Sequence, residues 1–214
     1  MQGLLSKTKP HEESQKSVLS IFTNFIICIL TVLVTLYFLN LYVNDDVQHF
    51  VSQNDNKVYE VRSSGSTATK QQAADYLLQL KTNINTLVSY MHDNKLPDQE
   101  TADRLYDRWI HCKLRETSSN EDSIAFTINK GHEIRICIRN GTNSFEDINT
   151  SLFVILHELA HIMSVSYGHN EEFNEHFSYI THLATSLGLY KPEDFHKEPK
   201  TYCGIKISNS PLYT

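Results

Sequence analysis

Two histidines and a glutamate lie within one helical turn in the segment His157-Glu158-Leu159-Ala160-His161. Residues four apart on an α-helix share a face, so both imidazole rings can reach one zinc ion at about 2.0 to 2.1 Å. Glu158 follows the first histidine and is turned by about 100° around the helix, which places its carboxylate nearer to a water on the metal than to the metal itself. The spacing therefore predicts zinc ligands at His157 and His161 and a general base at Glu158.

The alternative is a chance match, because the chain contains 11 histidines and short motifs have false positives. The surrounding residues 154–163 contain neither proline nor glycine, and their only charged side chain apart from the histidines is Glu158. An exposed helix with two accidental histidines would alternate with lysine, glutamate or glutamine on its other faces. The segment is apolar all round instead, which predicts a buried helix and favours the zinc site.

A catalytic zinc site needs a third protein ligand and leaves a fourth position for water. Downstream, Gly168 can end the first helix at a positive φ and Asn170 can cap a second helix, so that His169 would lie at the turn between them. The second helix would be recognisable by an apolar stripe from Phe173 to Leu187. We therefore predict His169 as the third ligand. Its rivals are His176, Glu172 and Glu175.

These residues resemble a known family. Residues 154–163 fit the extended zincin pattern, and Gly168-His169 followed by Phe173 is similar to the segment that supplies the third ligand in SprT-like and WLM-type zinc metallopeptidases. The chain departs from metzincins, because Ser164 and Tyr167 occupy the positions where those enzymes have glycine and histidine.

Three further segments are similar to predicted zinc metallopeptidases of large DNA viruses and some protists: residues 127–131, 136–139 and 202–205. The resemblance then covers about residues 120–212. It implies a zincin fold, a bound Zn²⁺ and peptide-bond hydrolysis, with His157, His161 and His169 as ligands and Glu158 as the base. The resemblance implies a protein or peptide substrate but does not identify it.

The second strong feature is an apolar run over residues 18–43 without a charged side chain. As a helix with a rise of 1.5 Å per residue, it is long enough to cross the roughly 30 Å hydrocarbon core of a bilayer. A cleaved signal peptide is the main rival, but its apolar region would be about 7 to 15 residues and would end in a small-residue cleavage site. The run therefore predicts a transmembrane helix with the lipid bilayer as its partner.

Basic residues near this run predict its orientation. Lys7, Lys9 and Lys16 precede it, whereas the next basic residue after it is Lys57. The positive-inside rule then places the N-terminus in the cytosol and the catalytic region on the lumenal or external side. Two N-glycosylation sequons, at Asn140 and Asn149, fit that orientation, although Asn149 can equally be the N-cap of the zinc-binding helix.

Charge and cysteine content narrow the function further. The formal net charge of −6 argues against nucleic acid as a partner, because nucleic-acid binders usually present a basic patch. Cys28 lies in the apolar run, which leaves Cys112, Cys137 and Cys203 for at most one disulfide. The chain contains no CxxC pair, so a structural zinc ribbon is not predicted.

Pattern and composition divide the chain into four parts: an N-terminal tail (1–17), the transmembrane helix (18–43), a polar stalk (44–67) and a zincin-like domain (68–214). The domain should have an α+β fold. Helical periodicity covers residues 68–92 and 98–112, and alternating residues 123–128 and 132–138 flank a turn. This hairpin either binds substrate as an edge strand or only covers the core. A short strand is expected within residues 202–207.

The combined prediction is a single-pass membrane protein that acts as a zinc-dependent endopeptidase. Two other functions remain open: a non-catalytic membrane or virion structural protein stabilised by zinc, and a metallohydrolase of a non-protein amide. The intact Glu158 disfavours the first, since a structural zinc site does not need a carboxylate beside the water position. A second electrophile in the site could be Tyr167, Tyr179 or Tyr202, and the sequence favours none of them.

Overall fold

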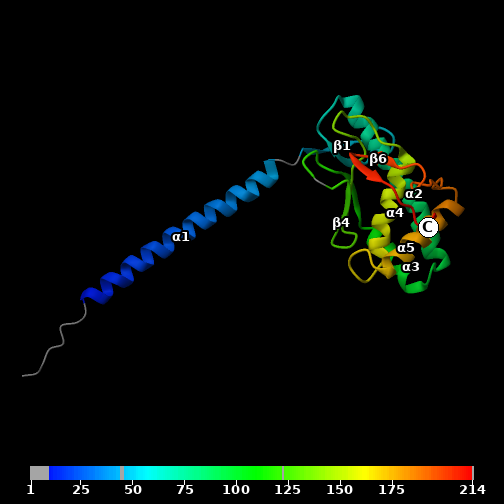
Figure 1. The fold of residues 1–214 in the computed structure, drawn as a ribbon. Coiled ribbons are helices and arrows are strands. Elements are labelled where there is room, and N and C mark those ends of the chain that lie inside the picture. Colours follow the sequence, from blue (N-terminus) through cyan, green and yellow to red (C-terminus); the bar gives the residue numbers. More distant parts are fainter. Residues whose placement is uncertain (1–9, 44–45, 122, 214) are drawn as a thin grey trace, which may run out of the picture. The chain divides into compact units, whose positions relative to one another are not determined.

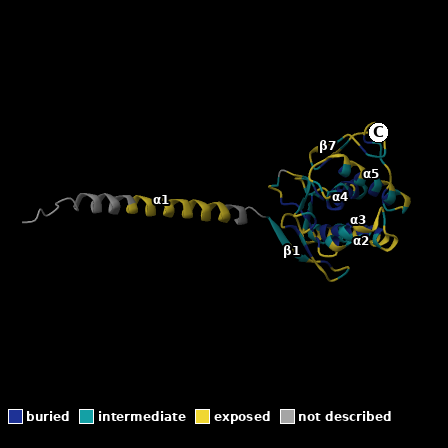
Figure 2. Ribbon diagram, turned by 90° about the horizontal axis from the view of Figure 1, so that it is seen from below, coloured by how far each residue is buried: buried dark blue, intermediate teal, exposed yellow. Residues whose placement is uncertain are grey.

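The computed structural model describes residues 10–43, 46–121 and 123–213, and the chain divides into two compact units at Asp45 (Figure 1). The first unit contains one helix, α1 (Pro10–Val43). Within α1, the segment Ser20–Leu39 is long and apolar enough to cross a membrane, and none of it is buried in the protein (Figure 2). The hydroxyl of Thr35 donates to the carbonyl of Thr31 at 2.8 Å, so this polar group is satisfied within the helix itself.

The second unit begins with a β-hairpin where we predicted a polar stalk. Strands β1 (Val47–Val51) and β2 (Val58–Arg62) pair antiparallel. The stalk prediction over residues 44–67 is wrong for this part of the chain, because Tyr59 and Val61 alternate into the core and are 6% and 0% exposed. The polar loop between the strands obscured that alternation.

A buried ion cluster also fixes β2 to the rest of the unit. The carboxylate of Glu116 accepts from the guanidinium groups of Arg62 at 2.7 Å and Arg139 at 2.6 Å. All three side chains are buried, and the second amino group of Arg139 also donates to the Arg62 carbonyl at 2.8 Å. Because an unpaired buried charge is costly, these three residues must be placed together.

Two helices follow, as the periodicity predicted: α2 (Thr67–Asn94) and α3 (Gln99–Trp109). The side chains of Ser66 and Asp98 cap their N-termini, each accepting from a backbone N–H three residues on. The indole of Trp109 donates to Asn85 at 2.7 Å, which connects the end of α3 to the middle of α2.

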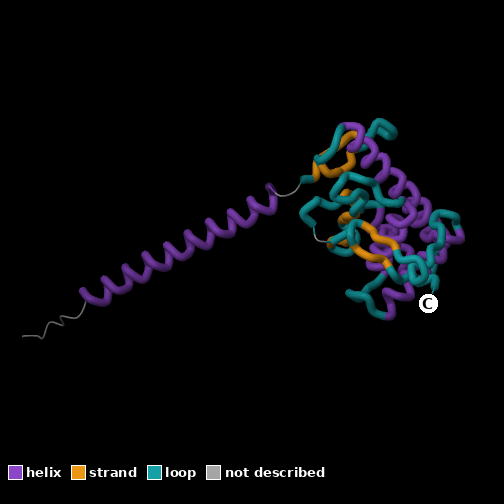
Figure 3. The backbone as a smooth tube through the Cα atoms, turned by 45° about the horizontal axis from the view of Figure 1, so that its top comes forward, coloured by secondary structure: helices purple, strands orange, loops and turns teal. Residues whose placement is uncertain are grey.

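The central sheet contains β3 (Lys113–Glu116), β4 (Ala125–Ile128) and β5 (Glu133–Ile136) in the order β3-β5-β4. Figure 3 shows the strands of this unit in orange among its helices. The predicted hairpin is confirmed, since β4 and β5 pair antiparallel, while β3 and β5 pair parallel. Positive φ angles at residues 129–131 form the turn between β4 and β5. Within the described residues, β4 pairs with a strand on one side only and is an edge of the sheet.

The predicted zinc-binding helix is α4 (Ile148–Met163), and it is buried over most of its length (Figure 2). Its N-cap is Asp147 rather than Asn149, because the Asp147 carboxylate accepts from the Thr150 N–H at 2.9 Å. The Asn149 amide instead donates to the Lys191 carbonyl at 2.9 Å.

Helix α4 ends at Met163, five residues before the glycine that we predicted would end it. Ser164 leaves the helical conformation, with ψ of 138°, and its hydroxyl donates back to the Ala160 carbonyl at 2.8 Å. Helix α5 (Glu171–Ser186) then begins at the predicted cap, since Asn170 accepts from the Phe173 N–H. Gly168 has the expected positive φ, 85°, within the connecting loop.

The C-terminal region forms a small hairpin, β6 (Lys200–Tyr202) and β7 (Ile205–Ile207), where we predicted one short strand. A disulfide joins Cys203, between these strands, to Cys137 at the end of β5. Cys112 is free and buried. The unit is thus a mixed helix-and-sheet domain, as predicted.

Candidate active site

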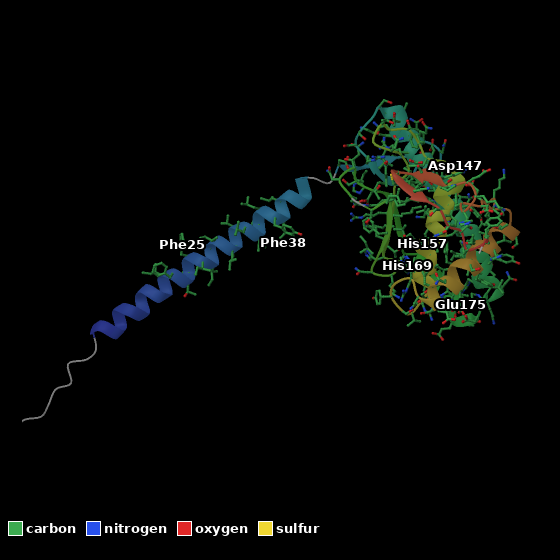
Figure 4. All side chains as sticks on the ribbon, viewed as in Figure 1. Phe25, Phe38, Asp147, His157, His169 and Glu175 are labelled. Atoms are coloured by element: carbon green, nitrogen blue, oxygen red, sulfur yellow. A yellow bond between two sulfur atoms is a disulfide. The ribbon has the colours of Figure 1, made fainter. Side chains whose placement is uncertain are left out.

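Three histidine side chains converge between α4 and the loop that precedes α5. His157 and His161 lie one turn apart on α4, and His169 lies on the loop, beside His157 (Figure 4). One ring nitrogen from each lies within 4.8 Å of the other two, and the Nε2 atoms of His157 and His169 are 3.0 Å apart. The structure therefore brings together the three residues that the sequence predicted as ligands.

These distances fit a metal ion. Three ligands at about 2.0 to 2.1 Å from one zinc in tetrahedral geometry have nitrogens roughly 3.4 Å apart, so the rings need to move by only a small amount. Three imidazoles are a donor set that suits zinc, and a site with three protein ligands leaves a fourth position free for water.

The aromatic ring of Phe173 packs against all three histidine rings. The ring of Phe173 in α5 lies 4.8, 4.3 and 4.7 Å from the centroids of His157, His161 and His169. The pKa of His157 is lowered to about 4, mainly by burial and to a smaller extent by the two neighbouring histidines. The pKa of His161 is also lowered to about 4, mainly by burial and to a smaller extent by His169 and Lys130. Both rings are consequently neutral at physiological pH, which is the form that binds a metal.

Glu158 lines the same cleft as the three histidines, and its carboxylate reaches the edge strand β4. Its side chain is 6% exposed, and its Oε2 atom accepts a hydrogen bond of 2.7 Å from the Thr127 hydroxyl. Burial raises the pKa of Glu158, while the hydroxyl and backbone N–H of Thr127 oppose that rise. A carboxylate with a raised pKa holds a transferred proton better than an exposed one does.

The loop that carries His169 is held from two sides. The ammonium group of Lys130, in the β4–β5 turn, donates to the carbonyls of residues 164, 165 and 166 at 2.7 to 2.8 Å. The carboxylate of Glu172, in α5, accepts from the backbone N–H groups of Val165 and Ser166 at 2.7 and 3.0 Å. These contacts position the third histidine relative to α4.

The three rivals for the third ligand lie elsewhere. Glu172 is engaged with the loop, and the Nδ1 atom of His176 is 2.9 Å from the Ser164 hydroxyl. Glu175 lines a depression on the surface of α5 that reaches His169 but neither of the other two histidines. Among the described residues, the three-ligand cluster that could hold a metal contains none of them.

The tyrosines also separate. The Tyr202 hydroxyl is buried and contacts Ser151 and the Cys137 carbonyl, and Tyr179 lines the depression on α5. Tyr167 alone of the three lines the same cleft as the histidines, with its ring 4.2 Å from the Lys130 ammonium group. Tyr167 is therefore the one candidate for a second electrophile that this geometry retains.

Two hollows meet at the histidines. We call the first the metal cleft; it has a volume of about 420 Å³ and extends from His157 along β4 to Asn129 and Lys130. We call the second the apolar hollow; it has a volume of about 470 Å³ and lies toward Ile124 and Phe153. Four residues line both: Ala125, His157, Glu158 and His169. The histidines thus lie midway along a groove beside the free edge of β4.

Two functional contacts were not predicted from the sequence. Thr127 orients Glu158, and Lys130 holds the loop of the third histidine. Both lie in residues 127–131, for which we predicted a strand, a turn and a resemblance to viral proteins, but neither of these contacts. Their partners are more than 30 residues away in the chain, so local pattern carries no signal for the contacts.

The chain is similar to a known domain and to several viral proteins. Residues 107–212 match the WLM domain. An uncharacterized protein of Acanthamoeba polyphaga mimivirus is 28% identical over 86% of this chain and 94% of its own length. An uncharacterized protein of Invertebrate iridescent virus 6 is 36% identical over 42% of this chain, and the match spans 51% of that protein. The resemblance to WLM-type metallopeptidases and to proteins of large DNA viruses is confirmed.

Among solved structures, the crystal structure of Wss1 from Saccharomyces cerevisiae aligns with 42% of this chain and 75% of its own, with 19% identity and a TM-score of 0.32.

Proposed function

We propose that this chain, whose residues 107–212 carry a WLM domain, is a membrane-anchored, zinc-dependent endopeptidase. One observation supports the proposal above all others. His157, His161 and His169 converge, while the adjacent Glu158 is buried, lines the same cleft, and accepts from the Thr127 hydroxyl without belonging to the three-ligand cluster. A purely structural zinc site has no use for a carboxylate in that place.

In the proposed mechanism, His157, His161 and His169 hold the zinc. The chemistry that a bound zinc would supply there is a lowered pKa for water and polarisation of the scissile carbonyl. Glu158, oriented by the Thr127 hydroxyl, takes a proton from the attacking water and passes it to the leaving amine. Tyr167 lies in the same cleft, where its hydroxyl can donate to the developing oxyanion.

The substrate would bind beside β4. This strand has a free edge in the described part of the chain, and the groove through the histidines follows it. An extended peptide can add to such an edge through main-chain hydrogen bonds. Of the two roles that the sequence left open for the hairpin, we propose substrate binding.

Metal removal tests the proposed function. The full chain, purified in detergent and loaded with zinc, is expected to cleave members of a peptide library. Chelation should abolish this cleavage and added zinc should restore it, because no side chain in the cleft can replace the ion in activating water. Mass spectrometry of the products measures cleavage after chelation and again after zinc is added. Cleavage that persists after zinc has been removed completely would contradict the proposal.

We further propose that residues 18–43 span a membrane and that the catalytic unit lies on the lumenal or external side. The distribution of lysines supports this orientation. The disulfide between Cys137 and Cys203 is an independent support, because such bonds persist mainly in oxidising compartments. The Asn140 sequon lies on a turn with an exposed Gly141 and Thr142, where a glycan can be accommodated.

Sealed microsomes test the orientation. Added protease is expected to leave the unit from residue 46 onward intact until detergent is present, because the membrane would enclose it. The chain should also carry a glycan that an Asn140→Gln substitution removes. Digestion of the unit without detergent would place it in the cytosol and reverse the assignment.

A further inference from the structure

The catalytic unit is anchored from Asp46, its first described residue. The Asp46 carboxylate accepts hydrogen bonds from the hydroxyls of Ser118 and Ser119 at 2.8 and 2.6 Å, and from the backbone N–H of Ser119 at 3.0 Å. The Asp46 carbonyl accepts from the backbone N–H of Ser63 at 2.7 Å. Strand β1 follows directly and pairs with β2. Residues from 46 onward therefore belong to the folded unit and do not form a stalk.

The hairpin β1–β2 is also held too firmly to detach and serve as a stalk. Strand β2 ends at Arg62, whose backbone N–H and guanidinium group both donate to the Glu116 carboxylate at 2.7 Å. The Glu116 side chain is fully buried, so detachment would leave its charge without one of its two arginine partners. Tyr59 and Val61 of the same strand would leave the hydrophobic core. The hairpin therefore stays bound to the unit.

The connection between this anchored start and the proposed membrane span is short. The apolar segment of α1 ends at Leu39, so residues 40–45 alone separate it from Asp46. Even fully extended, a connection of this length spans at most about 25 Å. A compact domain with the length of the unit Asp46–Thr214 has a diameter of about 40 Å. Every part of the catalytic unit then lies within about 65 Å of the hydrocarbon core, whatever its orientation.

We infer that the substrates are proteins anchored in the same membrane, and that they are cut in exposed segments close to the bilayer. The inference rests on the proposed peptidase function and the proposed span, and it adds a substrate class to them. Sites that lie beyond two folded domains of about 40 Å each are out of reach for a unit without a stalk.

Two physical effects favour such substrates over soluble proteins. An enzyme and a substrate that are tethered to one membrane meet at a raised effective concentration, and a short tether makes that concentration high. The groove beside the histidines would take an extended peptide, which exposed linkers next to a membrane span offer and folded domains do not. The short connection thus directs the site toward linkers of neighbouring membrane proteins.

The test uses vesicles that contain the zinc-loaded full chain and a lipid-anchored reporter. The reporter carries two copies of one peptide that the chain cleaves in detergent. The first copy lies between the anchor and two folded domains in series, and the second lies beyond both domains. The parent chain is expected to cut the first copy about ten times faster than the second, because the second lies about 80 Å from the bilayer. Mass spectrometry of the released fragments distinguishes the two cuts.

A stalk insertion provides the matched variant. About 40 residues of a Gly/Ser-rich sequence inserted between Asp45 and Asp46 add roughly 35 Å of average reach, and should bring the two rates to within a few-fold of one another. In detergent, kcat/KM for the free peptide should be the same for both chains, which would show that the insertion leaves the active site intact.

Equal cutting of both copies by the parent chain would overturn the inference and leave the peptidase function standing. An unchanged preference in the stalk variant would also overturn it, as would failure to cut either copy on vesicles that still cleave the free peptide. If the zinc-loaded chain cleaves no free peptide from a full library, the proposed function itself fails.

Discussion

Replacement of His169 by alanine is expected to remove zinc from the purified chain. Three protein ligands are the usual number at a catalytic zinc site, and His169 supplies the only one from outside α4. The loss in affinity should exceed the roughly 10- to 100-fold that removal of an outer-sphere partner costs. Elemental analysis after dialysis against a weak chelator measures the zinc content directly.

His176→Ala is the matched control, because this histidine lies on the following helix and contacts Ser164 rather than the cluster. It should retain one zinc per chain. Full zinc content in the His169 variant, together with loss in the His176 variant, would show that the third ligand comes from α5.

Glu158→Gln should separate metal binding from catalysis. The substitution preserves the shape of the side chain and its ability to accept from Thr127, but it removes the base. Zinc content and secondary structure are expected to stay unchanged, while kcat falls by about 10² to 10⁴. Circular dichroism, elemental analysis and peptide cleavage on the same preparation measure the three properties.

A rate close to that of the parent would show that Glu158 does not take the proton. Loss of zinc from this variant would mean instead that its carboxylate is a ligand. A zinc-loaded parent that cleaves nothing would favour the non-catalytic structural alternative.

The sequence predicted those parts of the site that depend on spacing within a helix or next to a cap. His157 and His161 share a face because they are four residues apart, and Asn170 caps α5 because its side chain reaches the Phe173 N–H. Periodicity of apolar residues likewise predicted α2 and the β4–β5 hairpin. In each case, the residues that determine the structure lie within one local segment.

The parts that the sequence did not predict depend on contacts between distant segments. The hairpin β1–β2 is fixed by Glu116, which lies 54 residues beyond Arg62. The early end of α4 is followed by a loop whose carbonyls bind Lys130, which lies 34 to 36 residues before them. From the sequence alone, polar residues in a short segment are predicted to be exposed to solvent. Their burial can be predicted only when the distant partner that contacts them is known.

Comparison of newly formed N-termini tests the central claim most directly. Membranes that carry the active chain would be compared with membranes that carry Glu158→Gln at equal zinc content and equal abundance. A peptidase predicts a set of new N-termini that appears only with the active chain, at sites on proteins from one side of the membrane. Identical sets of N-termini in the two samples would contradict peptide-bond hydrolysis as the function of this site.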